Sequence, residues 1–388
     1  MENTKLHKVD LIFENDGTCA TTVLDKVLSR KPEEIINDMI DSGLKGRGGA
    51  GFLTGLKWKF TRNETAEMKY IVCNADEGEP GTFKDREILD RVPEKVFTGM
   101  AIAGYAIGAK EGILYLRAEY NFLLPKLERV MNEFNKAIQD KKLDFSIDIR
   151  SGAGAYICGE ESALFESIEG KRGEPRNKPP YPTVSGLFGK PTVINNVETL
   201  VYATMINKYG PERFKEFGTK DSRGSKVFSV SGDTPNAGIY ELGLGMTVQE
   251  FVDEFGDGDT KAVQIGGASG MCVPRKKFKD TIIGYEGVPT GGSMMLFNST
   301  RSMYNVLHDY LDFFAEESCG QCTPCRVGCQ QLLKGIQAVK KGKQKPEYLE
   351  TLKKLAETMK LSAKCGLGQS VPNPFISIVD NFKEEIIY

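Results

Sequence analysis

The sequence predicts an α/β protein whose 388 residues divide into a layered α/β part, a smaller α+β part and a helical end. Strand-like apolar runs alternate with helical patterns as far as about residue 218, which is typical of layered α/β domains. Short strands, one helix and many glycines follow, and from residue 304 the apolar spacing is that of four helices. We therefore expect a lead-in with a glycine-rich loop over 1–55 and domains over 56–218, 219–303 and 304–388.

Each element of the α/β part is predicted from its own pattern. Apolar runs indicate strands at "KYIVC" (69–73), "EGILYLRAEY" (111–120) and "DFSIDIRSG" (144–152). Helical spacing indicates helices at "FTGMAIAGYAIGA" (97–109), "LLPKLERVMNEFNKAIQD" (123–140) and "EESALFESIEG" (160–170). The glycine-bracketed stretch "GAGAYICG" predicts one more strand, which ends at Gly159.

Composition excludes several classes of function. Hydrophobic residues make up 40% and charged residues 27% of the sequence, as in soluble globular proteins. A net charge of -2 gives no electrostatic basis for binding nucleic acid or an anionic membrane. No apolar run reaches the roughly 18 residues of a spanning helix, and the polar start predicts no signal peptide, so we expect a cytoplasmic protein without direct membrane insertion. Only two histidines, His7 and His308, argue against a histidine-based metal site or a Ser-His-Asp hydrolase.

The stretch "GRGGAGF" (46–52) matches the dinucleotide-binding pattern G-x-G-x-x-G through Gly46, Gly48 and Gly51. A dinucleotide-binding turn follows a strand, whereas the residues before this loop, "PEEIINDMIDSG", have the spacing of a helix. A phosphate loop of the G-x-x-x-x-G-K-[ST] type is also absent. Because so many glycines cost folding entropy, we interpret the loop as one that closely approaches a ligand, with a structural turn as the alternative.

The cysteines predict an iron–sulfur site. Cys319, Cys322 and Cys325 have C-x2-C-x2-C spacing, and the remote Cys365 supplies a fourth thiolate, which suits a [4Fe–4S] cluster. Structural zinc, the alternative, more often uses two C-x2-C pairs. Cys329, one helical turn after Cys325, competes as fourth ligand, but Cys365 is flanked by glycines that would let its loop wrap a cluster. The scattered Cys19, Cys73, Cys158 and Cys272 are interpreted as small buried residues.

Polar side chains follow the predicted strands. Asn74, Asp76, Glu77 and Glu79 come directly after the first strand, where ligands of open α/β sheets gather. They could bind sugar hydroxyls or a nicotinamide amide, with a solvated turn or a magnesium site as alternatives.

Three further stretches offer groups that could bind a nucleotide. Glu160 and Glu161 open a helix, where capping is the alternative role. A stiff proline loop presents Arg176, Lys178 and Tyr181, and Asn195 and Asn196 precede a helix whose amides could meet a phosphate.

Taken together, five motifs resemble one protein family over about residues 30–370: "GLKGRGGAGFLTGLKW", "CNADEGEPGTFKDRE", "YICGEESAL", "INNVET" and "ESCGQCTPCRVG". The family is that of the flavin- and NADH-binding 51-kDa subunit of respiratory complex I, with equivalent subunits in NAD-linked iron-only hydrogenases and formate dehydrogenases. The resemblance implies a Rossmann-like FMN/NADH domain, a small ubiquitin-like (SLBB) domain and a four-helix bundle carrying one [4Fe–4S] cluster.

The same resemblance implies roles for individual residues. FMN would be bound by Gly46, Arg47, Gly48, Gly49, Lys57, Asn74, Asp76, Glu77, Gly159, Glu160, Ile194, Asn195, Asn196 and Thr199. NAD(H) would lie against Phe52 and Phe60, and Glu79, Glu161, Lys178 and Tyr181 would bind its polar groups and adenine end. Glu79 and Glu161 are the expected catalytic residues, in the sense that they hold the reacting cofactor rather than transfer protons. The cluster would be held by Cys319, Cys322, Cys325 and Cys365.

The implied activity is that of an NADH dehydrogenase electron-input subunit. NADH releases two electrons together and a cluster accepts one, so a flavin must stand between them. Because neither a thioredoxin-like nor a ferredoxin domain is recognised in this sequence, we expect electrons to leave through a separate thioredoxin-like [2Fe–2S] subunit and an iron-only hydrogenase-type subunit.

Several alternatives stay open at this point. The chain could be a complex I or formate dehydrogenase subunit with the same chemistry, or a non-catalytic cluster-bearing scaffold. Reverse reaction and electron bifurcation are also open, and we expect NADH to be preferred over NADPH.

Overall fold

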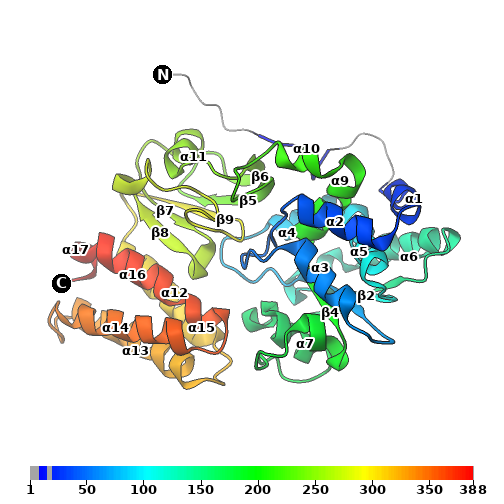
Figure 1. Ribbon diagram of the computed structural model, residues 1–388. Coiled ribbons are helices and arrows are strands. Elements are labelled where there is room, and N and C mark those ends of the chain that lie inside the picture. Colours follow the sequence, from blue (N-terminus) through cyan, green and yellow to red (C-terminus); the bar gives the residue numbers. More distant parts are fainter. Residues whose placement is uncertain (1–7, 15–19, 388) are drawn as a thin grey trace.

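The computed structural model describes residues 8–14 and 20–387. Figure 1 shows a helix-wrapped parallel sheet, a second sheet beside it, and a helical carboxyl-terminal part that packs under the second sheet. Helices of the first part, besides those named below, are α1 (Thr22–Leu28), α2 (Pro32–Asp41), α3 (Thr54–Asn63), α4 (Lys84–Arg91), α8 (Pro182–Ser185) and α10 (Pro211–Lys215).

The first sheet has four parallel strands in the order β3-β2-β1-β4. Its strands are β1 (Tyr70–Ala75), β2 (Glu111–Leu116), β3 (Ser146–Ser151) and β4 (Thr192–Asn196). The chain runs outward from β1 to β3 and then returns to the other side of β1 to form β4. The strand order therefore reverses between β1 and β4, and the crevice beyond the carboxyl ends of these two strands is where such sheets bind ligands.

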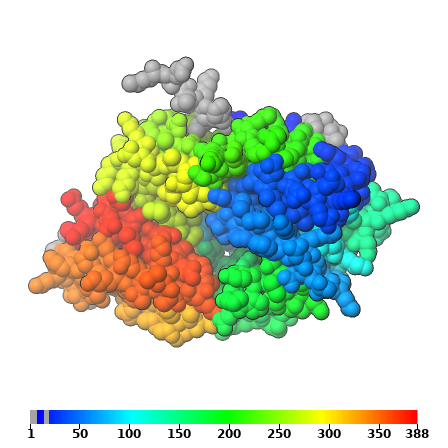
Figure 2. Space-filling model, viewed as in Figure 1, coloured from blue at the N-terminus to red at the C-terminus, as the bar shows by residue number. Residues whose placement is uncertain are grey.

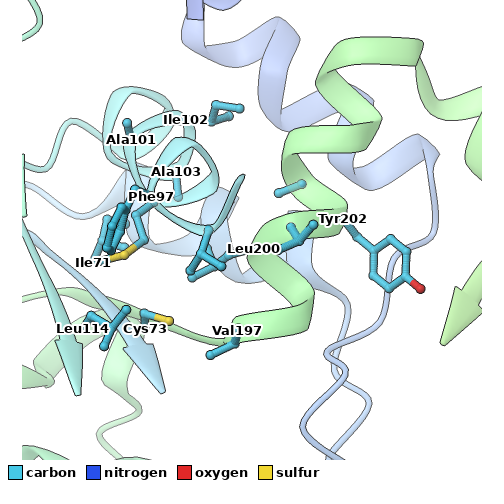
Figure 3. Close-up of a cluster of buried hydrophobic side chains, with 14 of the residues drawn as sticks. Ile71, Cys73, Phe97, Ala101, Ile102, Ala103, Leu114, Val197, Leu200 and Tyr202 are labelled. Atoms are coloured by element: carbon cyan, nitrogen blue, oxygen red, sulfur yellow. The ribbon is translucent and has the colours of Figure 1, made fainter. Parts of the chain in front are cut away.

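Both faces of this sheet are covered. Along β1, Ile71 and Cys73 face a core shared with α5 (Pro93–Ile107), α6 (Leu124–Asp140) and α9 (Val197–Tyr209). Val72 faces a second core shared with α7 (Glu161–Ile168), as the two-residue period of a strand requires. Figure 3 shows residues of the first core, including Ile71, Cys73, Phe97 and Leu200. A Cβ at Gly99 would lie 2.1 Å from the Leu200 carbonyl oxygen, so glycine allows α5 and α9 to pack this closely.

The second sheet has five strands in the order β6-β5-β9-β7-β8. They are β5 (Ser225–Gly232), β6 (Gly238–Gly243), β7 (Thr260–Ile265), β8 (Met271–Pro274) and β9 (Ser293–Asn298). Only β5 and β9 pair in parallel, and the other neighbours are antiparallel. Helix α11 (Val248–Phe255) closes a separate core through Phe251 and Phe255.

The carboxyl-terminal part is helical. It contains α12 (Met303–Glu317), α13 (Thr323–Lys340), α14 (Tyr348–Ser362), α15 (Gly366–Ser370), α16 (Pro372–Asn381) and α17 (Lys383–Ile386). Helices α13 and α14 approach closely because Gly328 and Gly335 face Met359 and Leu352. Within residues 8–14 and 20–387, no helix combines the length and the apolar character needed to cross a membrane.

One predicted element is wrong. The segment before Gly159 is not a strand but a short 3-10 helix, η2 (Tyr156–Gly159). Strand β3 is the edge of its sheet and ends at Ser151, and Gly154 turns the backbone with a φ of 75°. The scattered Cys73, Cys158 and Cys272 are buried as predicted, whereas Cys19 and His7 lie outside the described residues.

Candidate functional site

The glycine-rich loop connects α2 to α3, so it follows a helix as the sequence predicts. Gly46 N–H donates to the Phe52 carbonyl oxygen at 2.9 Å and closes the loop, while the Tyr285 hydroxyl donates to the Gly46 carbonyl oxygen at 3.1 Å. A Cβ at Gly48 would lie 3.3 Å from Asn196 Cβ, and one at Gly51 would lie 2.4 Å from the Tyr285 ring. The loop backbone is therefore held between Asn196, at the end of β4, and Tyr285, which lies in the connection that precedes β9 (Ser293–Asn298).

The side chain of Arg47 points into the protein interior and not toward solvent. Its guanidinium is buried, donates to the carbonyl oxygens of Lys45 and Arg223, and lies over the rings of Tyr202 and Phe214. Its backbone N–H donates to Thr199 Oγ1 at 2.9 Å. The predicted ligand residues Arg47 and Thr199 thus contact each other and shape the loop from beneath.

Asn74 and Asp76 lie at the carboxyl end of β1, inside the expected crevice. Asn74 Nδ2 donates to the Gly159 carbonyl oxygen at 2.8 Å, and Asn74 Oδ1 accepts from Asp76 N–H at 3.0 Å. Asp76 Oδ2 is buried and has no hydrogen-bond donor within the described part of the chain, and burial raises the pKa of Asp76 to about 7. A buried acceptor without a donor is the kind of atom that a bound ligand satisfies.

Glu77 and Glu79 turn toward other partners. Glu77 accepts from the N–H groups of Asp85 and Arg86 at 2.9 and 3.1 Å, so it holds the first turn of α4. Glu79 accepts from the Tyr156 hydroxyl at 2.6 Å and from the Ser269 N–H at 2.9 Å. The acidic side chains diverge, and no group of three metal-binding side chains in residues 8–14 and 20–387 is placed to hold one ion, so the magnesium alternative gains no support.

Four charged side chains form a row between α3, α7 and the proline loop. Lys178 Nζ donates to Glu160 Oε1 at 2.9 Å and to Glu161 Oε1 at 2.6 Å, and Lys57 Nζ lies 4.0 Å from Glu161 Oε2. Burial lowers the pKa of Lys57. Glu160 also accepts from the N–H groups of Ser162 and Ala163, so the capping role considered for it is present.

The residues at the end of β4 support the same crevice. Ile194 contributes its carbonyl oxygen, which accepts from Lys57 Nζ at 3.0 Å. Asn195 Oδ1 accepts from the buried Trp58 indole at 3.0 Å, and Asn196 Oδ1 accepts from Glu198 N–H at 3.0 Å and caps α9. These contacts bring Lys57, Ile194, Asn195 and Asn196 to one edge of the sheet.

Three predicted nucleotide-binding aromatic rings are unusually exposed. Phe52, Phe60 and Tyr181 are 50%, 47% and 58% exposed, and flat apolar rings exposed to this degree can stack on a ligand. A separate polar groove is lined by Glu160, Pro175, Arg176, Asn177, Lys178, Lys364, Cys365, Gly366 and Gln369. Figure 2 shows the surface hollowed where the segment near residues 160–180 meets the carboxyl-terminal helices.

The four predicted cluster cysteines surround one small cavity. Cys319, Cys322, Cys325 and Cys365 line it together with Ile157, Pro175, Ser318, Gln321, Lys364 and Leu367. Cys329 is fully buried in α13 with its Sγ 3.9 Å from Cys325 Sγ, and it does not line the cavity. A Cβ at Gly368 would lie 3.0 Å from Cys325 Cβ, so glycine lets the Cys365 segment close over this site. Four thiols around one cavity fit a four-iron cluster.

Several supporting residues were not predicted from the sequence. Trp58, Tyr156, Ser269 and Tyr285 hold predicted site residues, and a buried ion network joins Lys84, Asp85, Glu198 and Lys226. Lys84 and Asp85 belong to the motif "CNADEGEPGTFKDRE". Two adjacent opposite charges inside this motif could have indicated a buried ion pair. Lys226, Ser269 and Tyr285, which lie between residues 219 and 303, belong to none of the five motifs.

Comparison with known proteins identifies the family. Residues 39–204 match the profile described as the Nuo51 FMN-binding domain, and residues 305–388 match the NADH-ubiquinone oxidoreductase-F iron-sulfur binding region. The chain is 45% identical over 96% of its length to NAD-reducing hydrogenase HoxS subunit alpha of Cupriavidus necator, of which it covers 63%. The chain belongs to the Nuo51 family.

Further relatives agree with membership of the Nuo51 family. The chain is 42% identical to NADP-reducing hydrogenase subunit HndC of Solidesulfovibrio fructosivorans, over 93% of the chain and 77% of the relative. A solved NAD+-reducing [NiFe]-hydrogenase in the H2-reduced state superposes with a TM-score of 0.90 and 43% identity, over 96% of this chain and 65% of the other. The chain thus spans less than two thirds of the Cupriavidus protein and of the solved chain.

The two family matches cover the two candidate sites. The glycine-rich loop, Asp76 and the end of β4 all lie within the FMN-binding domain, and most residues that line the cysteine cavity lie within the iron–sulfur region. The orphaned acceptor of Asp76 and the glycines at the loop fit a ligand in the first site, and the four thiols fit a cluster in the second.

Proposed function

We propose that the chain is the electron-input subunit of an NAD-linked oxidoreductase, in which NADH reduces FMN and single electrons pass to a [4Fe–4S] cluster and on to partner subunits. One observation carries this proposal: the short helix η2 touches both sites. The Gly159 carbonyl oxygen at its end accepts from Asn74 in the crevice, and Ile157 lines the cysteine cavity. A single four-residue element between the two sites suits transfer of electrons from one to the other.

The protein's part in this chemistry is to bind, orient and exclude water. FMN, when bound, supplies the capacity to take an electron pair and release it singly. We assign its binding to Gly46, Arg47, Gly48, Gly49, Lys57, Asn74, Asp76, Glu77, Gly159, Glu160, Ile194, Asn195, Asn196 and Thr199. For Arg47, Glu77 and Thr199 the contribution is support of the loop and of α4, because their side chains are engaged by the protein.

Nicotinamide binding is assigned to the exposed rings and the charged row. Phe52, Phe60 and Tyr181 offer stacking surfaces, while Glu161 and Lys178 offer polar groups beside the groove. Glu79 takes part if its hydrogen bonds to Tyr156 and Ser269 rearrange when the nucleotide binds.

We propose that the chain consists of a lead-in with the glycine-rich loop (1–55), a Rossmann-like domain (56–218), an SLBB domain (219–303) and a four-helix bundle (304–388). The order β6-β5-β9-β7-β8 with one helix after the first hairpin supports a ubiquitin-like SLBB domain. Four helices of ten or more residues, α12, α13, α14 and α16, support the bundle.

For partners, we propose a thioredoxin-like [2Fe–2S] subunit and a hydrogenase-type subunit. The names of two relatives, both hydrogenase subunits, support a hydrogenase partner. The solved relative is a [NiFe] enzyme, so the iron-only type stays a proposal to be decided by native purification and metal analysis. Membrane-embedded or formate-oxidising partner subunits would instead identify a complex I or formate dehydrogenase assembly.

The experiment is reduction of a one-electron dye by NADH, catalysed by the FMN- and iron-loaded chain. The proposal expects NADH-dependent turnover that is lost when FMN is removed and restored when FMN is added back. A folded chain that holds iron but neither binds FMN nor oxidises NADH would identify the scaffold instead. Measurements of the direction of the physiological reaction and of electron bifurcation are made on the complete assembly with its partner subunits.

A further inference from the structure

A buried ion network joins the second sheet to the glycine-rich loop (46–52). Lys226, on β5, is fully enclosed, and its Nζ lies 3.0 Å from Glu198 Oε2 on α9. The same Nζ donates to the Arg47 carbonyl oxygen at 2.9 Å. Lys226 therefore contacts the backbone of the glycine-rich loop from a different domain.

The network extends to the capping residue of α9. Lys84 Nζ lies 3.0 Å from Glu198 Oε2 and 2.6 Å from Asp85 Oδ1, and it donates to Asn196 Oδ1 at 3.2 Å. Asn196 Nδ2 donates to Asp85 Oδ2 at 2.6 Å. Asn196 is the residue against which Gly48 packs, so the network supports two points of the loop, Arg47 and Gly48.

Stability alone does not account for this arrangement. Buried ion pairs can often be replaced by apolar residues without loss of stability, because removing charges from water is costly. Burial lowers the pKa of Lys226 to about 7 even though Glu198 opposes the shift, which reflects that cost. A directional role is the better explanation, since the lysine reaches a backbone carbonyl that an apolar side chain could not bind.

We propose that Lys226 is a positioning residue for flavin binding, which holds the Gly46–Gly49 backbone in the conformation that accepts FMN. This inference rests on the proposed function, because it concerns the same flavin site. It assigns to the second sheet a part in cofactor binding. Tyr285 reinforces that part by donating from the same domain to the Gly46 carbonyl oxygen.

The test compares Lys226→Met, Lys226→Arg and Lys69→Met in the full chain loaded with iron. Lys69 is a matched control, because it is also buried and donates to a backbone carbonyl oxygen, that of Arg62, but next to the amino end of β1. The dissociation constant of FMN is measured by flavin fluorescence, and the flavin midpoint potential, iron content and far-ultraviolet circular dichroism are recorded in parallel.

We expect Lys226→Met to weaken FMN binding about tenfold to a hundredfold, the range found when supporting residues of metal sites are removed. Its iron content should stay unchanged, Lys226→Arg should recover most of the affinity, and Lys69→Met should bind FMN as the wild type does. Glu198 keeps Lys84 as a cation partner in Lys226→Met, which favours a folded variant. If that variant does not fold, Lys226→Gln carries the same test, because its shorter side chain cannot reach both acceptors.

Wild-type affinity in Lys226→Met, or an equal loss in Lys69→Met, would overturn the inference. Those results leave the proposed function intact, because the wild type still binds FMN. If the wild type itself bound no FMN, the proposed function would fail first, and the two failures are thereby distinguished.

Discussion

Lys178 Nζ lies 2.6 Å from Glu161 Oε1, and Lys178 lines the polar groove together with Glu160. The same lysine is bound to Glu160, and its carboxylate partners raise the pKa of Lys178 although burial opposes the shift. Lys57 lies 4.0 Å from Glu161 on the other side. Both cations of this row are therefore occupied by carboxylates before a nucleotide arrives.

This pairing predicts a preference for NADH over NADPH. A 2′-phosphate near the row would meet Glu161 and would have to displace carboxylates from the lysines. We expect kcat/KM to be at least about tenfold higher for NADH, which corresponds to about 1.4 kcal/mol. Glu161→Gln should lower the ratio of kcat/KM for NADH to kcat/KM for NADPH, because it removes the negative charge that repels the 2′-phosphate.

Glu166→Gln is the matched control for the nucleotide experiment. Glu166 also lies on α7 but pairs with Arg176 rather than with Lys178. Glu166→Gln should leave the ratio of kcat/KM for NADH to kcat/KM for NADPH unchanged. Equal kcat/KM for NADH and NADPH in the wild type would contradict the prediction.

The cysteine cavity predicts which thiols hold the cluster. Cys365→Ser removes a cavity-lining sulfur and should abolish the [4Fe–4S] signal, whereas Cys329→Ser changes a sulfur that does not line the cavity and should retain it. Iron content and low-temperature EPR of the reduced proteins measure the difference. The opposite pattern would assign the fourth ligand to Cys329.

The raised pKa of Asp76 leads us to expect that the stability of the FMN-free protein depends on pH. Because burial raises its pKa to about 7, the folded state holds a proton that the unfolded state releases near pH 4. Stability should therefore fall as pH rises through this window, by up to about 1.4 kcal/mol for each pH unit. Asp76→Asn abolishes this contribution, so its stability relative to the wild type should rise between about pH 5 and about pH 8.

Denaturant unfolding at the two pH values tests this effect. Asp144→Asn serves as the control, because the Asp144 side chain is 79% exposed. Glu77, whose pKa burial also raises to about 7, is present in both proteins and contributes equally. A relative stability of Asp76→Asn that does not change with pH would show that Asp76 is not protonated in the folded state.

Local patterns predicted much of the fold, and contacts between distant segments account for what was missed. The apolar run 69–73 identified β1 because each of its faces meets a core, and cysteine spacing identified the thiols that line one cavity. The strand predicted before Gly159 is wrong because Gly154 turns the backbone away with a φ of 75° and residues Tyr156–Gly159 form a 3-10 helix instead. The contact between Lys226 and Arg47 joins residues 179 positions apart, so no local pattern could reveal it.

Electron transfer from NADH through FMN to the iron–sulfur cluster within one chain can be followed in an anaerobic titration of the FMN- and iron-loaded protein with NADH. Flavin absorbance and cluster EPR are recorded on the same samples. We predict that NADH bleaches the flavin band and that a reduced-cluster EPR signal appears, and that Cys365→Ser still shows bleaching without the cluster signal. An unbleached flavin, or a bleached flavin with a cluster that stays oxidised at every NADH concentration, would show that the chain does not pass electrons from NADH to the cluster.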